Sequence, residues 1–325
     1  MASRKAAVIA GTAVLAVVTG LAVATIGPPL PGSDSGGDQA KNIILLIGDG
    51  MGVTHVDAAR QVRYGAAGSL VMETLGGLGS VSTWAVARDS DQPDLVTESS
   101  AAATAWSSGV KTYNAAVGLD AYGKIVPTLM EQAKEAGLRT GNVSTAEVTD
   151  ATPAAMFAHA ALRGCQGPTY TEESCETIDG EQYLPIAQQI ARNNVADVIL
   201  GGGNARFTAE DQTIMEANGY TTLGEFGETV ATRVELDKVD GADQRLIGLF
   251  NSGNMTVEVN KAKGFPSDEV REEPSLEDMT AMALDLLSNS KDAEASIYGR
   301  ETINSVHRSK LSHVFVGEEQ CTHCT

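Results

Sequence analysis

The stretch from Asn42 to Gly52, NIILLIGDGMG, is an apolar run that ends on an acid between glycines. The run predicts a β-strand over 42–47, with Asp49 at the strand terminus and glycines that let the backbone approach a ligand closely. The pattern over 53–62 predicts a helix. Asp49 also fits a turn residue that caps this helix, and the glycines lack the Gly-x-Gly-x-x-Gly spacing of a dinucleotide-binding turn.

The alternation of strand and helix continues along the chain. Helices are predicted over 127–136 and 184–193, and strands over 140–143 and 196–200, the last of which runs into three glycines at 201–203. This alternation is typical of an α/β fold in which a mostly parallel central sheet has helices on both faces. Ligands of such sheets bind at the carboxyl ends of the strands.

The composition agrees with a large globular domain. The chain has 325 residues, of which 42% are hydrophobic, so it can bury a sizeable core. Its 42 acidic residues outnumber the 23 basic ones and give a net charge of −19. This charge argues against nucleic-acid binding by a basic surface and favours the binding of cations.

Residues 1–31 have the pattern of an export signal. Two basic residues precede an uncharged run over 6–26, and a Gly- and Pro-rich breaker follows. Small residues at 22–24 fit a cleaved signal peptide, but the run is also long enough for a retained signal anchor. The protein is therefore expected to be exported, in the periplasm, at the cell surface or secreted. A flexible linker over 32–39 leads to a folded part that begins near Ala40.

Ser99 begins an Ala-rich helical segment within residues 97–112. A hydroxyl at this place lies beside free N–H groups and the positive end of the helix dipole, where an anion binds and an alkoxide forms more easily. An ordinary helix cap is the alternative. No histidine accompanies a Gly-x-Ser-x-Gly motif, which disfavours a Ser-His-Asp hydrolase.

A third polar segment holds Asp150 and Thr152, whose hard oxygen atoms suit Mg²⁺ or its bound waters. Thr152 also fits a helix N-cap with Pro153 at the first helical position. The helical stretch is predicted to run on to His159 and Arg163. The planar guanidinium of Arg163 matches a phosphoryl group, and a surface arginine is the alternative.

Together these segments resemble the alkaline phosphatase family. The stretch 104–114, TAWSSGVKTYN, is especially characteristic, and the runs 200–207 and 247–255 follow in the family's order. The resemblance covers roughly residues 40–288 and implies hydrolysis of phosphate monoesters through a phosphoserine, with Zn²⁺ and Mg²⁺ as cofactors. The match around 104–114 disfavours a sulfatase or phosphodiesterase of similar architecture. A homodimer is one expected form of assembly.

The resemblance also implies roles for single residues. Ser99 matches the nucleophile and Arg163 the arginine that binds phosphate oxygens. Glu98 stands where the family has an aspartate that orients this arginine, and its extra methylene is expected to hold Arg163 less firmly. Cys165 and Cys175 match a disulfide pair.

Three residues match the family's metal site. Asp49 matches a carboxylate shared by zinc and magnesium, Thr152 a magnesium ligand, and Asp150 a residue beside the magnesium that acts through water. The other zinc ligands have no counterpart before residue 289. By this count the chain is expected to have little phosphatase activity, so a non-catalytic remnant that binds phosphate weakly is the alternative function.

Residues 289–325 form a divergent tail that does not resemble the family. Residues 294–298 are weakly similar to a metal-ligand segment of the family. They lack the apolar strand that precedes this segment in the family, and Tyr298 stands where a carboxylate is expected. The tail is expected to be disordered. Its end, Cys321-Thr322-His323-Cys324, has zinc-ligand residue types but no defensible zinc spacing, so no metal site is expected there.

Overall fold

The computed structural model describes residues 42–75, 77, 79–176, 182–240, 244–262 and 272–288, together with the backbone of 313–320. The predicted export signal and linker lie outside these residues. Among the described helices, none is both long and apolar enough to cross a bilayer.

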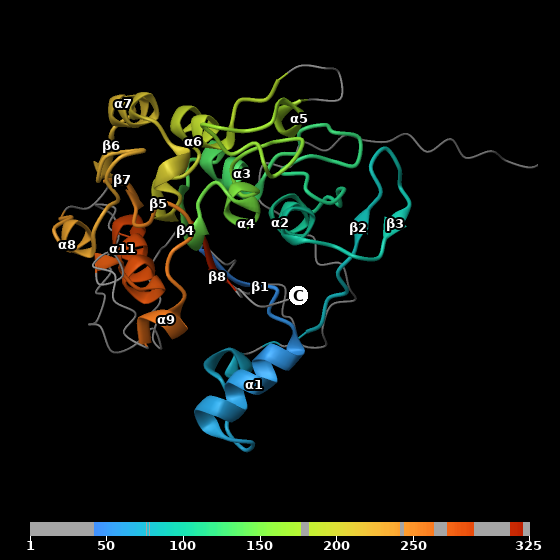
Figure 1. Cartoon of the computed structure of the whole chain (residues 1–325). Coiled ribbons are helices and arrows are strands. Elements are labelled where there is room, and N and C mark those ends of the chain that lie inside the picture. Colours follow the sequence, from blue (N-terminus) through green and yellow to red (C-terminus); the bar gives the residue numbers. More distant parts are fainter. Residues whose placement is uncertain are drawn as a thin grey trace, which may run out of the picture. The chain divides into compact units, whose positions relative to one another are not determined.

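Six parallel strands form the central sheet, in the order β1-β8-β4-β5-β7-β6 (Figure 1). Their bounds are Ile43–Asp49 for β1, Arg139–Glu147 for β4, Val198–Gly202 for β5, Tyr220–Leu223 for β6, Arg245–Leu249 for β7 and His313–Gln320 for β8. Two short strands, β2 (Ala85–Val86) and β3 (Pro93–Asp94), pair antiparallel outside this sheet. The parallel sheet with its helices confirms the predicted α/β fold.

The helices alternate with the strands as the sequence predicts. Their bounds are Val53–Tyr64 for α1, Ser99–Ser108 for α2, Leu129–Glu135 for α3, Ala151–Ala154 for α4, Glu172–Cys175 for α5, Ile186–Asn193 for α6, Ala209–Ala217 for α7, Arg233–Leu236 for α8, Glu258–Ala262 for α9 and Leu276–Ser288 for α11. Two 3-10 helices cover Val71–Thr74 and Asn204–Arg206. The prediction that helix α4 continues to Arg163 is wrong, because it ends at Ala154 and turns follow.

Strands β5 and β7 are buried on both faces of the sheet, which explains their apolar runs. Along β5, Val198 and Leu200 belong to a core cluster that contains Leu287 of α11, whereas Ile199 belongs to a second cluster that contains Ile190 of α6. This alternation follows from the two-residue period of a strand. The carboxyl edge of the sheet is thereby held between two packed layers.

The strand β8 occupies the middle of the sheet, between β1 and β4 (Figure 1). It pairs in parallel with both neighbours, from Val314 opposite Ile43 to Gln320 opposite Asp49 on one side, and from His313 opposite Arg139 on the other. The expectation of a disordered tail is therefore wrong for 313–320. Two partner strands supply the backbone hydrogen bonds of this segment, and such non-local pairing leaves no trace in local sequence.

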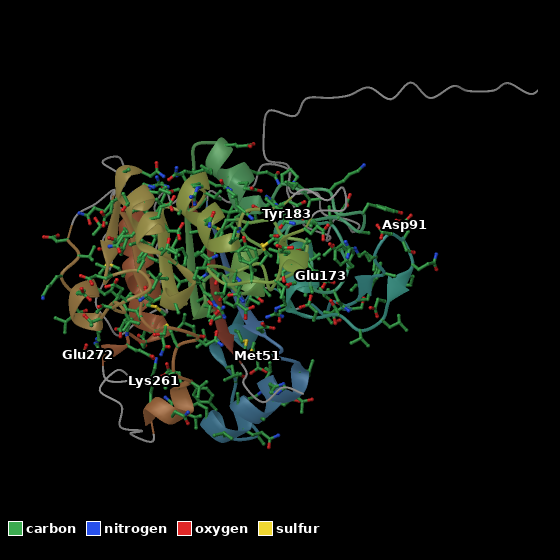
Figure 2. All side chains as sticks on the ribbon, turned by 45° about the horizontal axis from the view of Figure 1, so that its top comes forward. Met51, Asp91, Glu173, Tyr183, Lys261 and Glu272 are labelled. Atoms are coloured by element: carbon green, nitrogen blue, oxygen red, sulfur yellow. A yellow bond between two sulfur atoms is a disulfide. The ribbon has the colours of Figure 1, made fainter. Side chains whose placement is uncertain are left out.

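Two segments lie outside the packed layers. Helix α1 buries none of its residues and lies apart from the helices on the sheet in Figure 1. The turn of the β2–β3 hairpin carries Asp91, which lies far in Figure 2 from Met51, two residues after the end of β1. Neither segment contributes to the two large core clusters, so the packed sheet alone positions the polar residues described next.

Candidate active site

Six polar side chains form a closed ring at the carboxyl edge of the sheet. They are Asp49 at the end of β1, Glu98 and Ser99 at the start of α2, Asp150 and Thr152 at the start of α4, and Arg163 in the loop that follows. Each member is connected to the next by a hydrogen bond or an ion pair, or lies within two residues of it in the sequence. We call this set the carboxyl-edge ring. It contains every residue for which the sequence suggests a catalytic, orienting or metal-binding role.

Asp49 connects two hydroxyl groups. The Ser99 hydroxyl lies 3.0 and 2.8 Å from the two carboxylate oxygens of Asp49, and the Thr152 hydroxyl lies 3.2 Å from one of them. Gly50 follows with a φ of 66°, a left-handed conformation that turns the chain sharply and that glycine adopts without strain. Asp49 is therefore a ring residue and does not cap α1, whose N-cap is Gly52 and has no side-chain hydrogen bond.

Glu98 caps α2. Its carboxylate accepts hydrogen bonds from the N–H groups of Ser100 at 3.0 Å and Ala101 at 2.8 Å, and from the N–H of Ala115 at 2.8 Å. Ser99 is thus the first helical residue, and the interpretation of Ser99 as the helix cap is wrong. The N–H groups that were expected to bind an anion already donate to Glu98.

Arg163 is held between two carboxylates of the ring. Its Nη1 lies 3.0 Å from Glu98 Oε2 and its Nη2 lies 2.6 Å from Asp150 Oδ1. Burial alone would lower the pKa of Arg163, but the charges and hydrogen bonds of Asp150 and Glu98 raise it above its usual value. The extra methylene of Glu98 leaves this ion pair intact.

Asp150 positions α4 as well as Arg163. It is the N-cap of α4 and accepts a hydrogen bond from the N–H of Ala151 at 2.7 Å. The alternative interpretation of Thr152 as the N-cap is therefore wrong. Because Thr152 lies within the first turn, its hydroxyl is free to reach Asp49.

No histidine of the described residues belongs to the ring. The ring nitrogens of His159 lie 2.8 Å from the carbonyl oxygen of Gly118 and 2.9 Å from Glu131, which places this side chain in a buried structural contact. His55 lies in the exposed helix α1. Neither His55 nor His159 therefore belongs to the ring that contains Ser99.

The ring oxygens fit a hard cation better than a zinc ion. The ring contains three carboxylates and one guanidinium, and Asp49, Asp150 and Thr152 offer the oxygen ligands that Mg²⁺ prefers, with water to complete its coordination. Zinc sites in proteins usually include nitrogen or sulfur ligands. Within the described ranges, no group of three His, Cys, Asp or Glu residues could hold a metal ion.

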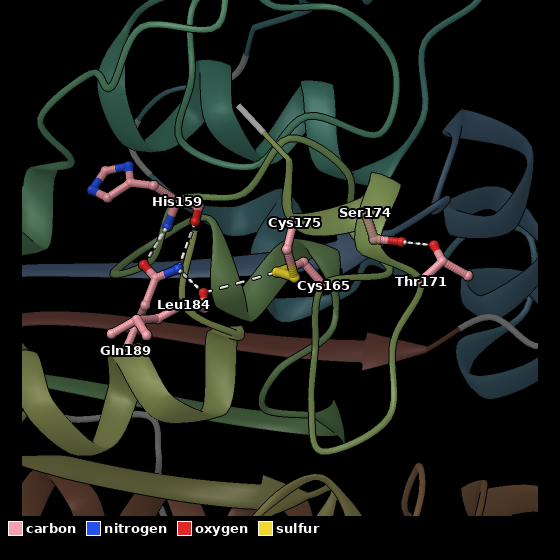
Figure 3. Close-up of a disulfide and its surroundings, with 7 residues drawn as sticks. All are labelled: His159, Cys165, Thr171, Ser174, Cys175, Leu184 and Gln189. Carbon is pink, nitrogen blue, oxygen red and sulfur yellow. Dashed lines mark hydrogen bonds between the residues drawn. A yellow bond between two sulfur atoms is a disulfide. The ribbon is translucent and has the colours of Figure 1, made fainter. Parts of the chain in front are cut away.

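A disulfide joins Cys165 to Cys175 (Figure 3), and Cys165 follows Arg163 by two residues in the same loop. The two Cα atoms are 5.0 Å apart, and both residues are buried. The carbonyl oxygen of Cys165 accepts a hydrogen bond from the N–H of Ile186 at 2.8 Å, which ties the loop to α6. The loop of Arg163 is therefore fixed at its downstream end.

A second ion pair, which the sequence did not predict, lies at the same edge. Glu147 is the last residue of β4, and its carboxylate lies 2.7 Å from Nε and 3.2 Å from Nη2 of Arg206. The N–H of Glu147 donates to Asn254 at 2.9 Å. The position of Glu147 in the sequence, three residues before Asp150 and at the end of a strand, could have indicated that it lies near the site.

Comparisons with known proteins agree with this geometry. The family model described as alkaline phosphatase matches residues 40–294. The alkaline phosphatase of Escherichia coli K12 is 46% identical over 227 residues, which cover 67% of this chain and 48% of that protein. The streptomycin-6-phosphate phosphatase of Streptomyces griseus is 36% identical over 306 residues, which cover 88% of this chain and 65% of that protein.

A solved structure shows the same fold. The crystal structure of Thermus thermophilus alkaline phosphatase superposes with a TM-score of 0.59 at 25% sequence identity, over 87% of this chain and 50% of that one. The chain therefore spans about half the length of several proteins that it matches. Strand β8 lies beyond the range that the family model matches.

Proposed function

Since the chain belongs to the alkaline phosphatase family, we propose that it hydrolyses phosphate monoesters at the carboxyl-edge ring. The observation that carries this proposal is the closure of the ring. A hydroxyl nucleophile, a guanidinium for phosphate and oxygen ligands for a hard cation meet at one edge of the sheet, although they come from distant parts of the sequence.

Ser99 is the nucleophile in this proposal. Its hydroxyl hydrogen points to Asp49, so the remaining lone pairs of the oxygen are available for attack on phosphorus. The phosphoryl group passes to the Ser99 oxygen while the alcohol leaves with a proton. Water then cleaves the phosphoserine, which releases phosphate and restores the hydroxyl.

Arg163 binds the phosphoryl group. A guanidinium has five N–H donors, and the two ion pairs of Arg163 leave several for phosphate oxygens. Because the N–H groups of Ser100 and Ala101 are used by Glu98, Arg163 is the principal cation for this purpose. None of these contacts involves the alcohol part of the substrate, so the proposed substrate class is phosphate monoesters in general. Streptomycin 6-phosphate, which the name of the Streptomyces relative contains, is one example of this class.

Asp49, Thr152 and Asp150 would hold Mg²⁺. A divalent cation bound there offsets the charge of the three ring carboxylates and of the incoming phosphate, and it stabilises the transition state. Asp150 also orients Arg163, so the cation and the guanidinium are positioned by one carboxylate.

A non-catalytic phosphate-binding protein is the second candidate function. It is favoured by the lack of a nitrogen- or sulfur-containing metal site among the described side chains. The zinc content of the purified chain separates the two candidates, because a phosphatase of this family uses zinc and a remnant has no need of it.

Trapping of the phosphoserine tests the main proposal. The full chain is incubated with radioactive inorganic phosphate, Zn²⁺ and Mg²⁺ at mildly acidic pH and is then denatured. Label on Ser99 that is lost in Ser99→Ala and kept in Ser107→Ala supports the proposal; Ser107 lies in the same helix and donates only to the Thr104 carbonyl. Label that persists in Ser99→Ala places the nucleophile elsewhere. Phosphate binding without label favours the second candidate.

Export and assembly complete the proposal. We propose that the chain is exported by residues 1–31, which lie outside the described residues, and that it forms a homodimer. Mapping the amino terminus of the secreted protein tests the first statement and distinguishes a cleaved signal from an anchor. Light scattering of the purified protein tests the second.

A further inference from the structure

We propose that His159 is a positioning residue for the proposed phosphatase reaction. With a proton on each ring nitrogen, His159 fixes the loop that carries Arg163, and it thereby fixes the place at which Arg163 meets Glu98. The inference rests on the proposed function for the role of Arg163 in binding phosphate.

His159 is a buried titratable residue that the proposed reaction does not use. Among the other histidines and cysteines whose side chains the structure describes, His55 is exposed on α1, and Cys165 and Cys175 form the disulfide. The tail cysteines, within 321–324, lie outside the described residues, so the expectation that they bind no metal stays a prediction. His159 is only 6% exposed, and each of its polar groups has a partner.

Both ring nitrogens of His159 face groups that accept hydrogen bonds. Nδ1 lies 2.8 Å from the carbonyl oxygen of Gly118, and Nε2 lies 2.9 Å from Oε1 of Glu131. Burial alone would raise the pKa of Glu131, but hydrogen bonds from His159 and the Thr128 N–H lower it below its ordinary value, so this carboxyl group is charged at neutral pH. Neither a carbonyl oxygen nor a carboxylate can donate, so each ring nitrogen carries a proton and the ring is an imidazolium.

The backbone of His159 is held as firmly as the ring. The side chain of Gln189, which is buried on α6, accepts a hydrogen bond from the His159 N–H at 2.9 Å and donates one to the His159 carbonyl oxygen at 2.6 Å (Figure 3). Gly118 has a φ of 61°, and a Cβ atom there would clash with Nδ1 of the ring. Glycine is therefore the residue that lets the two segments approach this closely.

His159 is followed directly by a short antiparallel pairing, which we call the loop ladder. Val117 and Ala160 exchange both backbone hydrogen bonds, at 3.0 and 2.9 Å. The N–H of Arg163 donates to the carbonyl oxygen of Ala115 at 2.7 Å. His159 thus stands at one end of the loop ladder and Arg163 at the other.

The far end of the loop ladder sets the contact between Arg163 and Glu98. The N–H of Ala115 donates to Oε1 of Glu98 at 2.8 Å, and Oε2 of the same carboxylate lies 3.0 Å from Nη1 of Arg163. Ala115 has a φ of 74°, a left-handed conformation that is strained in an alanine and persists only where its surroundings enforce it. The imidazolium of His159 enforces it by binding Gly118, at the other end of the same segment.

A histidine meets a need that an apolar residue of similar size cannot meet. A leucine would fill the space, but it would leave the Gly118 carbonyl oxygen without the ring donor and the Glu131 carboxylate without its cation. Burial of a polar group that has lost its partner is unfavourable, so the segment would shift to reach water. Such a shift would be passed along the loop ladder to Arg163.

Nuclear magnetic resonance of the unaltered chain tests the protonation. In protein with nitrogen-15-labelled histidine, we expect two protonated ring nitrogens for His159 at neutral pH, both slow to exchange with water. Loss of the signals in His159→Gln assigns them. A single ring proton would overturn the proposal, because one of the two acceptors would then lack its donor.

Two substitutions of His159 test the effect on the loop ladder. His159→Leu removes both ring donors, whereas His159→Gln keeps one. Without phosphate, amide hydrogen exchange at 117, 160 and 163 should be fastest in His159→Leu and intermediate in His159→Gln. Leu286→Ala is the control for lost stability, because Leu286 is buried on α11 in the core cluster that does not contain Val117 and Ala160. It should leave exchange at these three amides ahead of global unfolding unchanged.

Binding of inorganic phosphate in the presence of Mg²⁺ tests the consequence for the site. Because coupling between separate sites is typically about fivefold or more, we expect His159→Leu to lower phosphate affinity by at least that factor. His159→Gln should restore part of this affinity, and Leu286→Ala should keep all of it. A purely structural role would instead give equal losses in variants of equal stability.

The outcomes separate this inference from the proposed function. An unaltered chain that binds no phosphate contradicts the proposed function, and the ring protons and amide exchange still decide whether His159 fixes Arg163. Phosphate binding that is the same in both His159 variants as in the unaltered chain overturns the inference, and so does a loop ladder that ignores both substitutions. If His159→Leu does not fold, His159→Gln and the ring protons of the unaltered chain decide the matter.

Discussion

Arg163 Nη1 lies 3.0 Å from Glu98 Oε2, although 65 residues separate the two in sequence. The same carboxylate caps α2 and binds the N–H of Ala115, so Glu98 joins helix α2, a neighbouring loop and Arg163. We expect a side chain with this many partners to affect both stability and the proposed binding of phosphate.

Glu98→Gln should therefore lower both properties. An amide keeps one acceptor oxygen but loses the charge that holds Arg163, so we expect the free energy of unfolding to fall by about 1–3 kcal/mol and phosphate affinity to fall severalfold. Chemical denaturation and calorimetric titration with inorganic phosphate measure the two effects. Glu210→Gln, an exposed glutamate on α7, is the control. Unchanged phosphate affinity in Glu98→Gln would contradict the orienting role.

Ser100→Ala should leave the chain as stable or make it more stable. Ser100 is fully buried, and its hydroxyl oxygen has no hydrogen-bond partner within the described residues. Removing an unsatisfied buried hydroxyl relieves up to about 1–2 kcal/mol. Thermal unfolding of Ser100→Ala beside Ser107→Ala, which loses a hydrogen bond to Thr104, makes the comparison. A clear loss of stability in Ser100→Ala would show that its hydroxyl has a partner in solution.

Removal of β8 should prevent proper folding. A chain ending at Ser288 leaves β1 and β4 with unpaired edges in the middle of the sheet, and such edges promote aggregation. A chain ending at Gln320 keeps the strand and should fold. Solubility, gel filtration and circular dichroism of the two truncations measure this. A soluble, cooperatively unfolding chain that ends at Ser288 would show that β8 is dispensable.

Glu131 should make stability depend on acid pH. Burial alone would raise the pKa of Glu131, but hydrogen bonds from His159 and the Thr128 N–H lower it below the ordinary value of 4.5. A carboxyl group with a lowered folded-state pKa contributes its full stability above the unfolded-state value, and that contribution is lost as pH falls through the folded-state value. The free energy of unfolding should thus decline below about pH 5.

Glu131→Gln should flatten this acid decline and lower stability at neutral pH, because His159 and Thr128 lose a charged acceptor. Urea denaturation across the acid range gives both values. Glu135→Gln, an exposed residue of the same helix, should keep the original pH dependence. An acid decline in Glu131→Gln equal to that of the unaltered chain would assign the effect to other carboxylates.

The disulfide between Cys165 and Cys175 should stabilise the folded chain. The bond closes a loop with a sequence separation of 10, for which chain entropy predicts about 3 kcal/mol. Replacement of both cysteines by serine should lower the free energy of unfolding by about this amount and loosen the loop of Arg163. Non-reducing peptide mapping of exported protein checks the bond, and two free thiols there would contradict it.

Local sequence determined much of this protein. The apolar run before Asp49, the helical pattern after it and the strand before the glycines at 201–203 each form the predicted element. The unbroken apolar run of β5 fits its burial on both faces of the sheet, whereas β1 leaves Leu46 exposed. The ring residues could also be predicted from the sequence. The segments that contain Ser99, Asp150 and Arg163 follow one another in the order found in the alkaline phosphatase family.

Tertiary structure alone decided the rest. The sequence predicts Ser99 and Thr152 as possible helix caps, but Glu98 caps α2 and Asp150 caps α4. Each of these carboxylates binds at least one backbone N–H group at the start of its helix and also forms an ion pair with Arg163. Strand β8 could not be predicted either, because its partners β1 and β4 lie far away in the sequence. Hydrogen bonds between distant strands fix register, and that register brings the tail to Asp49.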